Sequence, residues 1–427
     1  MPALDPGTSY YEATALPRPP RPPVDGGATC DVCVVGGGLT GLSAALDLAR
    51  RGYDTLVLEQ ATVGAGASGR NGGHVMPGFS GEDATLLDAV GPDAARTLFD
   101  TTREAVALVE ERVRHYAIPC DLRHGHLTAA LKPRHMRALE EHAETWRERY
   151  GYEGLALLDR EQARRKVASD RYVGGLYDPA ALHLHPLNYT LGLARAAEAE
   201  GARIAEHTRV HRVETHGRPP VVHTDGGAVR AGHVLLCGNA YGAGLGRPLR
   251  RTVMPVGTYI VATEQLGAHR ARALIPGDCA VADAKAVLDY FRLSHDHRLL
   301  FGGAGTYSGR RPRDPARALR PLMLRVFPGL ADAAITHAWG GHVAITLDRL
   351  PHFGRLAPEV YFAQGFSGHG VALAGLAGRV MAEAVAGTAE RFDLYARLPH
   401  RPFPGGPLLR TPALVLAMAW HRLRDAL

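Results

Sequence analysis

A run of three glycines between an apolar segment and a helical pattern constrains the fold of this chain more than any other feature. The stretch "VCVVGGGLTGLSAAL" covers residues 32–46, and its apolar start is typical of a parallel strand buried on both faces. From Leu39 to Ala49 the apolar residues return at helical spacing, and Gly52 can end that helix. The stretch "DTLVLEQ" then supplies a second strand. This order predicts a βαβ unit within a parallel sheet.

The glycines of this turn match the spacing G-x-G-x-x-G where a strand passes into a helix. Gly36 permits a tight turn, Gly38 lets a diphosphate approach the backbone, and Gly41 lets the helix pack close to the sheet. Glu59 ends the second strand, where a carboxylate can accept hydrogen bonds from an unphosphorylated ribose. The motif therefore predicts a site for FAD or NAD rather than NADP, although a purely structural glycine turn shares this spacing.

Two further glycine-rich segments favour FAD over NAD. The segment "GAGASGRNGGHV", residues 64–75, can wrap backbone around a large flat ligand and bring Ser68, Arg70 and Asn71 to a diphosphate. The segment "GFSGHGVAL" precedes another helical pattern near the C-terminus. The amides and dipole of that helix N-terminus would stabilise negative charge on a reduced flavin, although a glycine-rich start to a core helix gives the same pattern.

The order of elements predicts an α/β (α+β two-domain) fold, in which a Rossmann-like FAD-binding domain is interleaved with a mainly antiparallel-sheet substrate domain. Residues 202–216 are a candidate pair of strands. The expected division of the chain comprises an N-terminal arm at 1–27, the FAD-binding domain at 28–115, 175–250 and 335–395, the substrate domain at 116–174 and 251–334, and a C-terminal tail or helix at 396–427.

Charge and cysteine content argue against several other classes of protein. The net charge of +6 comes from scattered side chains, so we expect a mildly basic enzyme rather than a nucleic-acid-binding protein. No apolar run has the length of a signal peptide or a membrane span, so we expect a cytoplasmic protein with no stable membrane insertion. Cys30 and Cys33 form a CxxC without a second pair at zinc spacing, so we expect no metal site.

Motifs along nearly the whole chain resemble those of one flavoprotein superfamily. They include "SYYEAT", "DVCVVGGGLTGLSAALDLARRGYDTLVLE", "VGAGASGRNGGHV", "YFRLSHDHRLLFGGAGTY" and "WGGHVAITLDRLPHFGR". In order and spacing the chain is similar to the glycine oxidase/D-amino-acid oxidase superfamily, and within it to gamma-glutamylputrescine oxidase-like enzymes. The resemblance implies oxidation of an amine C–N bond to an imine by hydride transfer to the flavin N5, followed by hydrolysis. It also implies O2 as acceptor and a polyamine or conjugated amine as substrate.

The same resemblance and the glycine motifs assign residues to the site. The expected contacts of a non-covalent FAD are Gly36, Gly38, Leu39, Thr40, Gly41, Glu59, Gln60, Gly66, Ala67, Ser68, Arg70, Asn71, Gly72, Gly73, His74, Val210, Gly238, Gly341, Gly368, His369, Gly370 and Val371. The candidate catalytic and substrate-facing residues, each of which is also compatible with core packing, are His74, Tyr259, Tyr290, Arg292, Trp339, His342 and His369.

The sequence departs from the superfamily pattern at positions that affect substrate and acceptor. Val343 stands where amino-acid oxidases carry an arginine for the substrate carboxylate, so an amine without that carboxylate is favoured. Arg292 is a candidate for a different carboxylate or a structural arginine. The strand "RLLFGGAGTY" has no lysine where some relatives use one in the reaction with O2. His74 lies where some relatives link the flavin covalently, and we expect it to remain unlinked.

Two other functional classes stay open at this stage. One is a flavin-dependent amino-acid oxidase, a dehydrogenase or a biosynthetic tailoring oxidase. The other is a flavoprotein with a structural role or a tRNA-modifying relative that uses its basic surface. Production of hydrogen peroxide separates an oxidase from a dehydrogenase, and salt-dependent RNA binding would indicate the last class.

Overall fold

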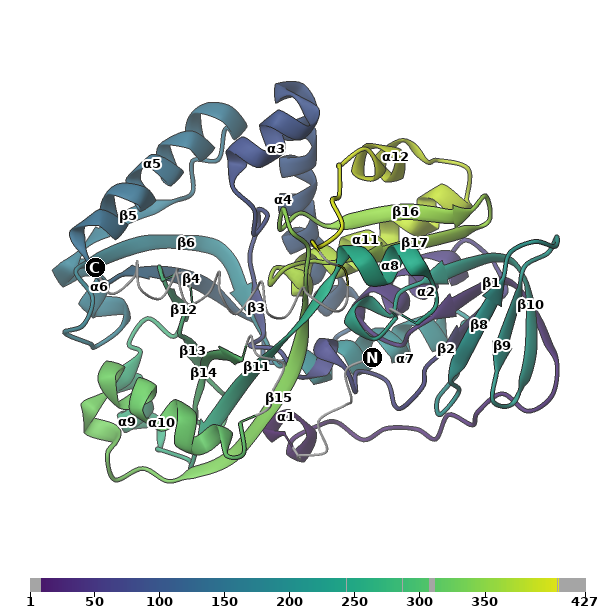
Figure 1. Cartoon of the computed structure of the whole chain (residues 1–427). Helices are drawn as coiled ribbons and strands as arrows, with labels where there is room; N and C mark the ends of the chain where they lie inside the picture. The colour runs from purple at the N-terminus through teal and green to yellow at the C-terminus, as the bar shows by residue number, and fades with distance from the viewer. Residues whose placement is uncertain (1–8, 243, 286, 307–311, 405, 407–427) are drawn as a thin grey trace.

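The computed structural model describes residues 9–242, 244–285, 287–306, 312–404 and 406. Within this part of the chain two β-sheets lie side by side, and helices pack against both (Figure 1). The first sheet has the strand order β16-β17-β10-β1-β2-β7, with β9 and β8 attached to β10. The second has the order β15-β11-β14-β13-β12-β4-β6-β3, with β5 attached to β6. The two-sheet α/β architecture expected from the sequence is confirmed.

The first sheet has a parallel centre, as its apolar strands predict. Its parallel strands are β1 (Ala28–Val35), β2 (Thr55–Leu58), β7 (Arg203–Ala205), β10 (Gly227–Leu236) and β17 (Val360–Gln364). Its antiparallel members are β16 (His352–Ala357), β9 (Val221–Thr224) and β8 (Val210–Glu214). The expected strand pair at 202–216 is wrong, because β7 pairs with β2 whereas β8 pairs with β9.

Helices cover one face of this sheet as a packed layer. They are α2 (Leu39–Ala49), α4 (Pro92–His115), α7 (Pro186–Ala199) and α11 (Gly370–Val385). Helix α2 is buried on all sides, more than a single apolar stripe predicts. Its polar residues Ser43 and Asp47 accept hydrogen bonds from the buried Arg112 of α4 at 2.7 and 3.0 Å, so the helix carries no unpaired charge into the core.

The second sheet is antiparallel except for the β12–β4 pair. Its strands are β3 (His74–Val75), β4 (Arg123–Ala130), β5 (Ala156–Asp159), β6 (Gly174–His183), β11 (Met254–Thr263), β12 (Ala280–Asp283), β13 (Tyr290–Leu293), β14 (Leu299–Thr306) and β15 (Ile335–Ile345). The pairing differs from the expected division, because β3, β15 and all but the first residue of β6 lie in segments expected for the FAD-binding domain. Strand β15 pairs with β11, and β6 pairs with β3 and β4, all of them far away in sequence, so local patterns do not identify these partners. The nearby β5 is a further partner of β6.

The remaining helices and 3-10 turns complete the fold. They are α1 (Tyr10–Ala13), α3 (Asp83–Val90), α5 (Pro133–Tyr150), α6 (Arg160–Lys166), α8 (Arg247–Thr252), α9 (Ala268–Leu274), α10 (Pro315–Val326), α12 (Glu390–Ala396), and the 3-10 turns η1 (Ala67–Gly69), η2 (Asn239–Tyr241) and η3 (Pro328–Leu330). Tyr10 and Tyr11 are fully buried, so the N-terminal arm packs into the body of the molecule. Most of the C-terminal tail or helix expected at 396–427 lies outside the described residues.

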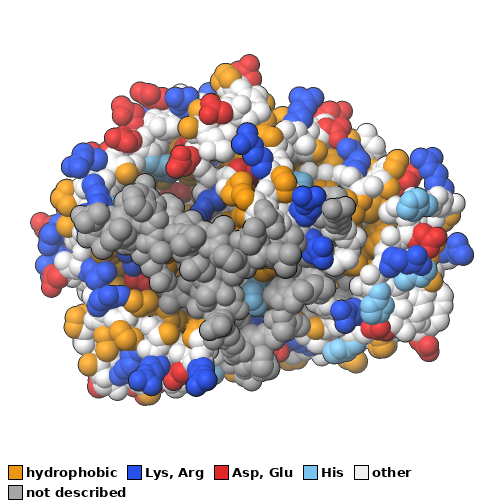
Figure 2. All heavy atoms as spheres, in the orientation of Figure 1, with side chains coloured by type: hydrophobic (Ala, Val, Ile, Leu, Met, Phe, Trp, Pro, Cys, Tyr) orange, Lys and Arg blue, Asp and Glu red, His pale blue; other side chains and the backbone are white. Residues whose placement is uncertain are grey.

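On the face drawn in Figure 2, the basic and acidic side chains of the described residues intermingle. Among the described residues no helix is both long and apolar enough to cross a membrane. In that same part of the chain, no group of three or more His, Cys, Asp or Glu side chains is arranged to hold a metal ion.

Candidate functional site

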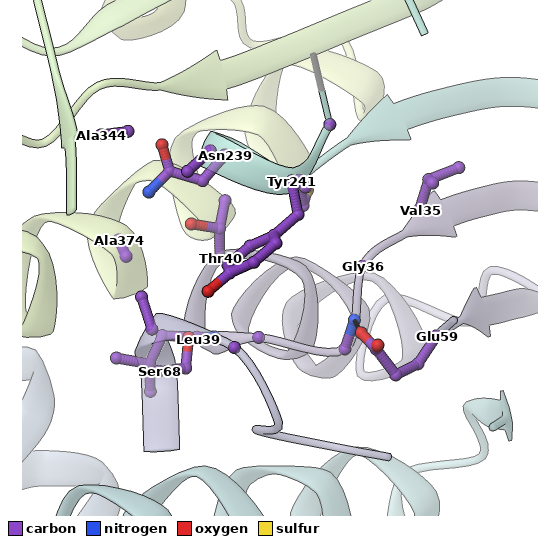
Figure 3. Close-up of a pocket in the computed structure, with 18 of the residues that line it drawn as sticks. Val35, Gly36, Leu39, Thr40, Glu59, Ser68, Asn239, Tyr241, Ala344 and Ala374 are labelled. Carbon is purple, nitrogen blue, oxygen red and sulfur yellow. Dashed lines mark hydrogen bonds between the residues drawn. The ribbon is translucent and has the colours of Figure 1, made fainter. Parts of the chain in front are cut away.

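A long cavity runs along the carboxyl edge of the first sheet, where the loops after β1, β2, β10 and β17 meet (Figure 3). Ligands of open parallel sheets bind at this edge, because the loops there are free of ladder hydrogen bonds. The predicted cofactor-binding residues on its wall are Gly36, Gly38, Leu39, Thr40, Glu59, Gln60, Gly66, Ala67, Ser68, Asn71, Val210, Gly238, Gly368, Gly370 and Val371. The cavity therefore joins three glycine-rich segments that are far apart in sequence.

The first glycine turn leaves its backbone open to the cavity. Gly36 has φ +116°, and a Cβ on Gly41 would lie 2.0 Å from the Gly36 carbonyl oxygen. A Cβ on Gly38 would lie 2.7 Å from Ser68 Oγ. Gly38 begins α2 without a side-chain cap, so the helix N-terminus remains available to an anion. These contacts explain the three motif glycines: Gly36 and Gly41 allow close packing of the chain itself, and Gly38 keeps the start of α2 open to the cavity.

Glu59 lies beside this turn in Figure 3, at the opposite end of the cavity from Ala344 and Ala374. Its two carboxylate oxygens accept hydrogen bonds from the Gly37 and Ala61 amides at 2.8 and 2.9 Å. Burial raises the pKa of Glu59, while these amide bonds act in the opposite direction. Each oxygen keeps a second lone pair for a ligand hydroxyl, as expected for a ribose-binding acid.

The second glycine segment is held in shape mainly by its own side chains. Asn71 donates to the Ala67 and Ser68 carbonyls at 3.0 and 2.9 Å and accepts from the Gly73 amide at 2.7 Å. Arg70 Nε donates to the Gly340 carbonyl at 2.8 Å, toward β15 and away from the cavity wall. Of the three expected diphosphate donors, Ser68 is therefore the one whose hydroxyl lies against the first turn, where it accepts from the Leu39 amide at 3.0 Å.

The far end of the cavity is formed by the N-terminus of α11. Gly368 has φ +111°, and His369 precedes the helix without a side-chain capping hydrogen bond. Gly370 and Val371 line the cavity here together with His342. Uncapped helix N-termini thus lie at both ends, one suited to phosphate groups and the other to negative charge on a flavin ring. FAD fits this arrangement of donors.

Several predicted residues do not reach the cavity wall. Among the expected cofactor contacts these are Gly41, Arg70, Gly72, Gly73, His74, Gly341 and His369, and among the candidate catalytic residues all except His342. Trp339 is fully buried, and its Nε1 donates to the Arg70 carbonyl at 3.1 Å. Tyr259 is 6% exposed and packs in the core of the second sheet. For these two residues core packing describes the geometry better than substrate contact.

Arg292 is buried and bonded to backbone rather than to a carboxylate. Its Nε donates to the Gly72 carbonyl at 2.8 Å, and its Nη atoms donate to the Leu184 and Leu293 carbonyls at 2.7 and 3.0 Å. Nη2 also donates to the Tyr11 hydroxyl at 3.2 Å. The guanidinium therefore ties the N-terminal helix to the second glycine segment, and its geometry favours a structural role over binding a substrate carboxylate.

Val343 lines the cavity at the α11 end, between His342 and Ala344. Arg209 is the one arginine among the described residues of the wall, and it precedes Val210 on the β8 side of the cavity. The described wall near α11 thus presents no guanidinium for a substrate carboxylate, consistent with the departure seen in the sequence.

The sequence analysis missed other residues of the site. Asn239 and Tyr241 follow β10, and Phe366 and Ser367 follow β17. The Tyr241 ring lies across the middle of the cavity in Figure 3, with its hydroxyl 3.5 Å from His342 Nδ1. Their position directly after apolar strands was the available signal, because the carboxyl ends of parallel strands meet at one edge.

Comparisons with known proteins agree with this geometry. Residues 31–384 match the family model described as FAD dependent oxidoreductase. The chain is 45% identical over 421 residues to gamma-glutamylputrescine oxidoreductase of Escherichia coli (strain K12), covering 98% of both chains. It is 27% identical to glycine oxidase of Geobacillus kaustophilus over 85% of this chain and 95% of that one.

Solved structures share the fold. The crystal structure of glycine oxidase from Geobacillus kaustophilus superimposes with a TM-score of 0.70, at 24% identity over 88% of this chain and 99% of that chain. L-proline dehydrogenase from P. horikoshii gives a TM-score of 0.71, at 21% identity over 87% and 98% of the two chains. With the cavity, its two helix N-termini and the full-length matches taken together, the chain belongs to the DAO family of FAD-dependent oxidoreductases.

Proposed function

We propose that this enzyme oxidises the C–N bond of a primary or secondary amine, and that its substrate is a polyamine or a conjugated amine such as gamma-glutamylputrescine. The observation that carries the proposal is Val343 on the cavity wall, at an end where the described wall holds no arginine. A bare α-amino acid would lack the bidentate anchor that its carboxylate needs. The 45% identity to gamma-glutamylputrescine oxidoreductase, over 98% of both chains, supports the same substrate class.

The two ends of the cavity would divide the work of binding and catalysis. The amides at the start of α2 and the carboxylate of Glu59 would hold the diphosphate and ribose of FAD. When bound, FAD supplies the acceptor for the hydride that leaves the carbon next to the amine nitrogen. The α11 N-terminus, with Gly370 and Val371 on the wall, would stabilise negative charge at that end of the cavity. Water then hydrolyses the imine to an aldehyde and the leaving amine.

Anaerobic titration of the purified holoenzyme with single amines tests the substrate proposal. Gamma-glutamylputrescine, putrescine, glycine and sarcosine would be compared by loss of the oxidised flavin absorbance. We expect gamma-glutamylputrescine to reduce the flavin fastest and glycine to be poor, because no arginine on the described wall near α11 faces its carboxylate. Rapid reduction by glycine or sarcosine with no response to the two polyamine compounds would overturn the proposal.

A dehydrogenase is the second candidate, because the strand "RLLFGGAGTY" contains no lysine to assist the reaction with O2. Mixing the substrate-reduced enzyme with air-saturated buffer separates the two activities. We expect rapid reoxidation with one hydrogen peroxide formed per amine oxidised. Reoxidation by an artificial dye but not by O2 would show a dehydrogenase and leave the amine substrate class intact.

A further inference from the structure

Arg292 on β13 is a buried cation that the proposed amine oxidation does not use. Its side chain lies in the core, and the residue is 2% exposed. Arginine stays protonated in proteins, and burial of an ionised group is strongly unfavourable unless other groups compensate it. The partners of this guanidinium therefore decide whether its charge is cancelled within the protein or remains available to a ligand.

The partners of Arg292 are neutral dipoles. Its N–H groups donate to the carbonyls of Gly72, Leu184 and Leu293 and to the hydroxyl of Tyr11. The guanidinium carbon also lies over the Tyr11 ring, 5.8 Å from the ring centre. Among the described residues no carboxylate forms an ion pair with it. Carbonyl dipoles and an aromatic ring stabilise a cation but leave its net charge uncancelled.

The titratable groups near Arg292 do not cancel this charge either. His183 and His185 flank Leu184, and burial lowers the pKa of each imidazole to about 3, with the Arg292 charge acting in the same direction. Both imidazoles are therefore neutral. The acid on the turn after β13, Asp296, is already paired with Arg298, whose Nε donates to it at 2.8 Å.

Arg292 lies directly behind the second glycine segment, residues 64–75. Gly72, whose carbonyl accepts from Arg292 Nε at 2.8 Å, follows Asn71 of the cavity wall. On the other side of Asn71, Arg70 donates to the β15 backbone two residues before His342 of the wall. The guanidinium thus supports the part of this segment that borders the α11 end of the cavity, where a flavin ring fits.

We propose that the Arg292 guanidinium favours the negatively charged, two-electron-reduced form of bound FAD, and that Tyr11 and the Gly72 carbonyl hold it in position. Reduction adds two electrons and one proton, equivalent to a hydride, so the cofactor gains one negative charge. A fixed positive charge in a medium of low dielectric constant stabilises this form more than the oxidised one. Arg292 therefore makes bound FAD a stronger electron acceptor.

The inference gives a role to Tyr11, which belongs to the motif "SYYEAT". Tyr11 is fully buried, and its ring meets that of Trp339 edge to face at 5.2 Å. Because Trp339 Nε1 donates to the Arg70 carbonyl, Tyr11 contacts the donors to both the Arg70 and the Gly72 carbonyls. Tyr11 is thus a positioning residue for Arg292. The inference goes beyond the proposed amine oxidation, because it depends on bound FAD and not on which amine reduces it.

The reduction potential of the bound flavin tests the inference without any amine. Xanthine and xanthine oxidase reduce the holoenzyme slowly and anaerobically together with a dye of known potential, and the two absorbances give the ratio of reduced to oxidised flavin. Arg292→Met removes the charge and keeps an unbranched side chain. We expect the equilibrium constant for two-electron reduction to fall about tenfold, which is a decrease of about 30 mV in potential.

Further variants separate charge from shape. Arg292→Lys keeps the positive charge but loses the planar set of donors, so its potential should stay close to that of the unmodified enzyme. Tyr11→Phe removes one hydrogen bond to the guanidinium and should lower the equilibrium constant by about threefold. Arg298→Met is the matched control, because Arg298 precedes β14 in the same sheet and is paired with Asp296. Its potential should not change.

The outcomes are distinct from those for the proposed function. An unchanged potential in Arg292→Met, or an equal decrease in Arg292→Lys or Arg298→Met, overturns the inference. Where Arg292→Met fails to fold or to bind FAD, Arg292→Gln supplies the same measurement, since its amide can still donate to the Gly72 carbonyl. Loss of FAD from both neutral variants also overturns the inference, because Arg292 would then only shape the site. None of these results depends on an amine, so the amine titration can succeed or fail independently.

Discussion

The two ends of the cavity are built in different ways from the same kind of element, a helix N-terminus. The α2 end is made by residues close together in sequence, from Gly36 to Ser68, and backbone amides dominate it. The α11 end gathers Gly370, His342 and Phe366 from segments far apart in the chain. We therefore expect cofactor binding to depend on a local motif with little tolerance for side chains, and substrate selection to depend on residues that tertiary contacts bring together.

The largest effect should come from Gly38→Val, at the α2 end. The new side chain would occupy the space that the diphosphate needs, because even a Cβ there lies 2.7 Å from Ser68 Oγ. We expect a folded protein that purifies without flavin, a loss of at least about 3 kcal/mol of binding free energy. The ratio of visible flavin absorbance to protein absorbance measures the effect. Gly217→Val is the control, since a Cβ at Gly217 meets nothing within 4 Å; full flavin content in the Gly38 variant would refute the diphosphate site.

A smaller effect at the same end is expected from Glu59→Gln. In the native protein the Gly37 and Ala61 backbone N–H groups each donate to a different oxygen of Glu59. A glutamine side chain has a single acceptor oxygen for both N–H groups, so no acceptor remains for a ribose hydroxyl. FAD affinity should fall by about 2 kcal/mol, roughly 30-fold. Flavin fluorescence during reconstitution of the apoprotein gives the dissociation constant. Glu161 is exposed, so Glu161→Gln should leave the dissociation constant of FAD unchanged. An equal FAD affinity in the two variants would show that Glu59 does not bind the ribose.

Acid should destabilise the second sheet, because its buried His183 is neutral at neutral pH. Burial lowers the pKa of His183 to about 3, with Arg292, Arg123 and His126 acting in the same direction and the Asp278 carbonyl opposing them. Because the folded pKa lies below the unfolded value, the stabilising contribution is complete above about pH 6.5 and is lost as pH falls toward 3.

His183→Gln should therefore flatten the acid limb of the stability curve. The expected change is about 1.4 kcal/mol per pH unit below pH 6.5 in the free energy of unfolding by urea. The exposed His216→Gln provides the comparison, with the slope of the unmodified protein expected. An unchanged slope for His183→Gln would mean that this imidazole is already protonated in the folded state.

The smallest effect should come from Val343→Arg, which tests the α11 end. A guanidinium on the cavity wall offers the carboxylate anchor that the chain lacks there, so glycine should gain relative to gamma-glutamylputrescine. We expect the ratio of their kcat/KM values to shift about tenfold, or about 1.4 kcal/mol. Val343→Met controls for added bulk. A shift of the same size with methionine would attribute the change to shape rather than charge.

Prediction from sequence succeeded where the chain is locally regular. The strand–turn–helix from β1 to α2 and the acid at Glu59 follow from spacing alone, because the hydrogen bonds that define them lie within one short segment. It was less successful for long-range pairing. Strand β15 runs beside β11 some 80 residues earlier in the chain, and nothing in its own pattern identifies that partner.

Side-chain roles at the substrate end depended on tertiary structure for the same reason. Arginine and tryptophan are residue types that often contact a substrate. In this structure, however, Arg292 donates to the Leu184 carbonyl and Trp339 to the Arg70 carbonyl, both in the core. His126 has no motif around it, and only the second sheet brings its ring to 5.4 Å from the ring of His74.

The sequence by itself determined that the chain has a parallel nucleotide-binding sheet, a diphosphate turn and the residues that make it, because those properties reside in local spacing and the absence of side chains. The tertiary structure decided which polar groups near the flavin end are already hydrogen-bonded and which remain available. That distinction depends on distances between segments far apart in the chain, as the hydrogen bonds of Arg292 to the Leu184 carbonyl and of Trp339 to the Arg70 carbonyl show.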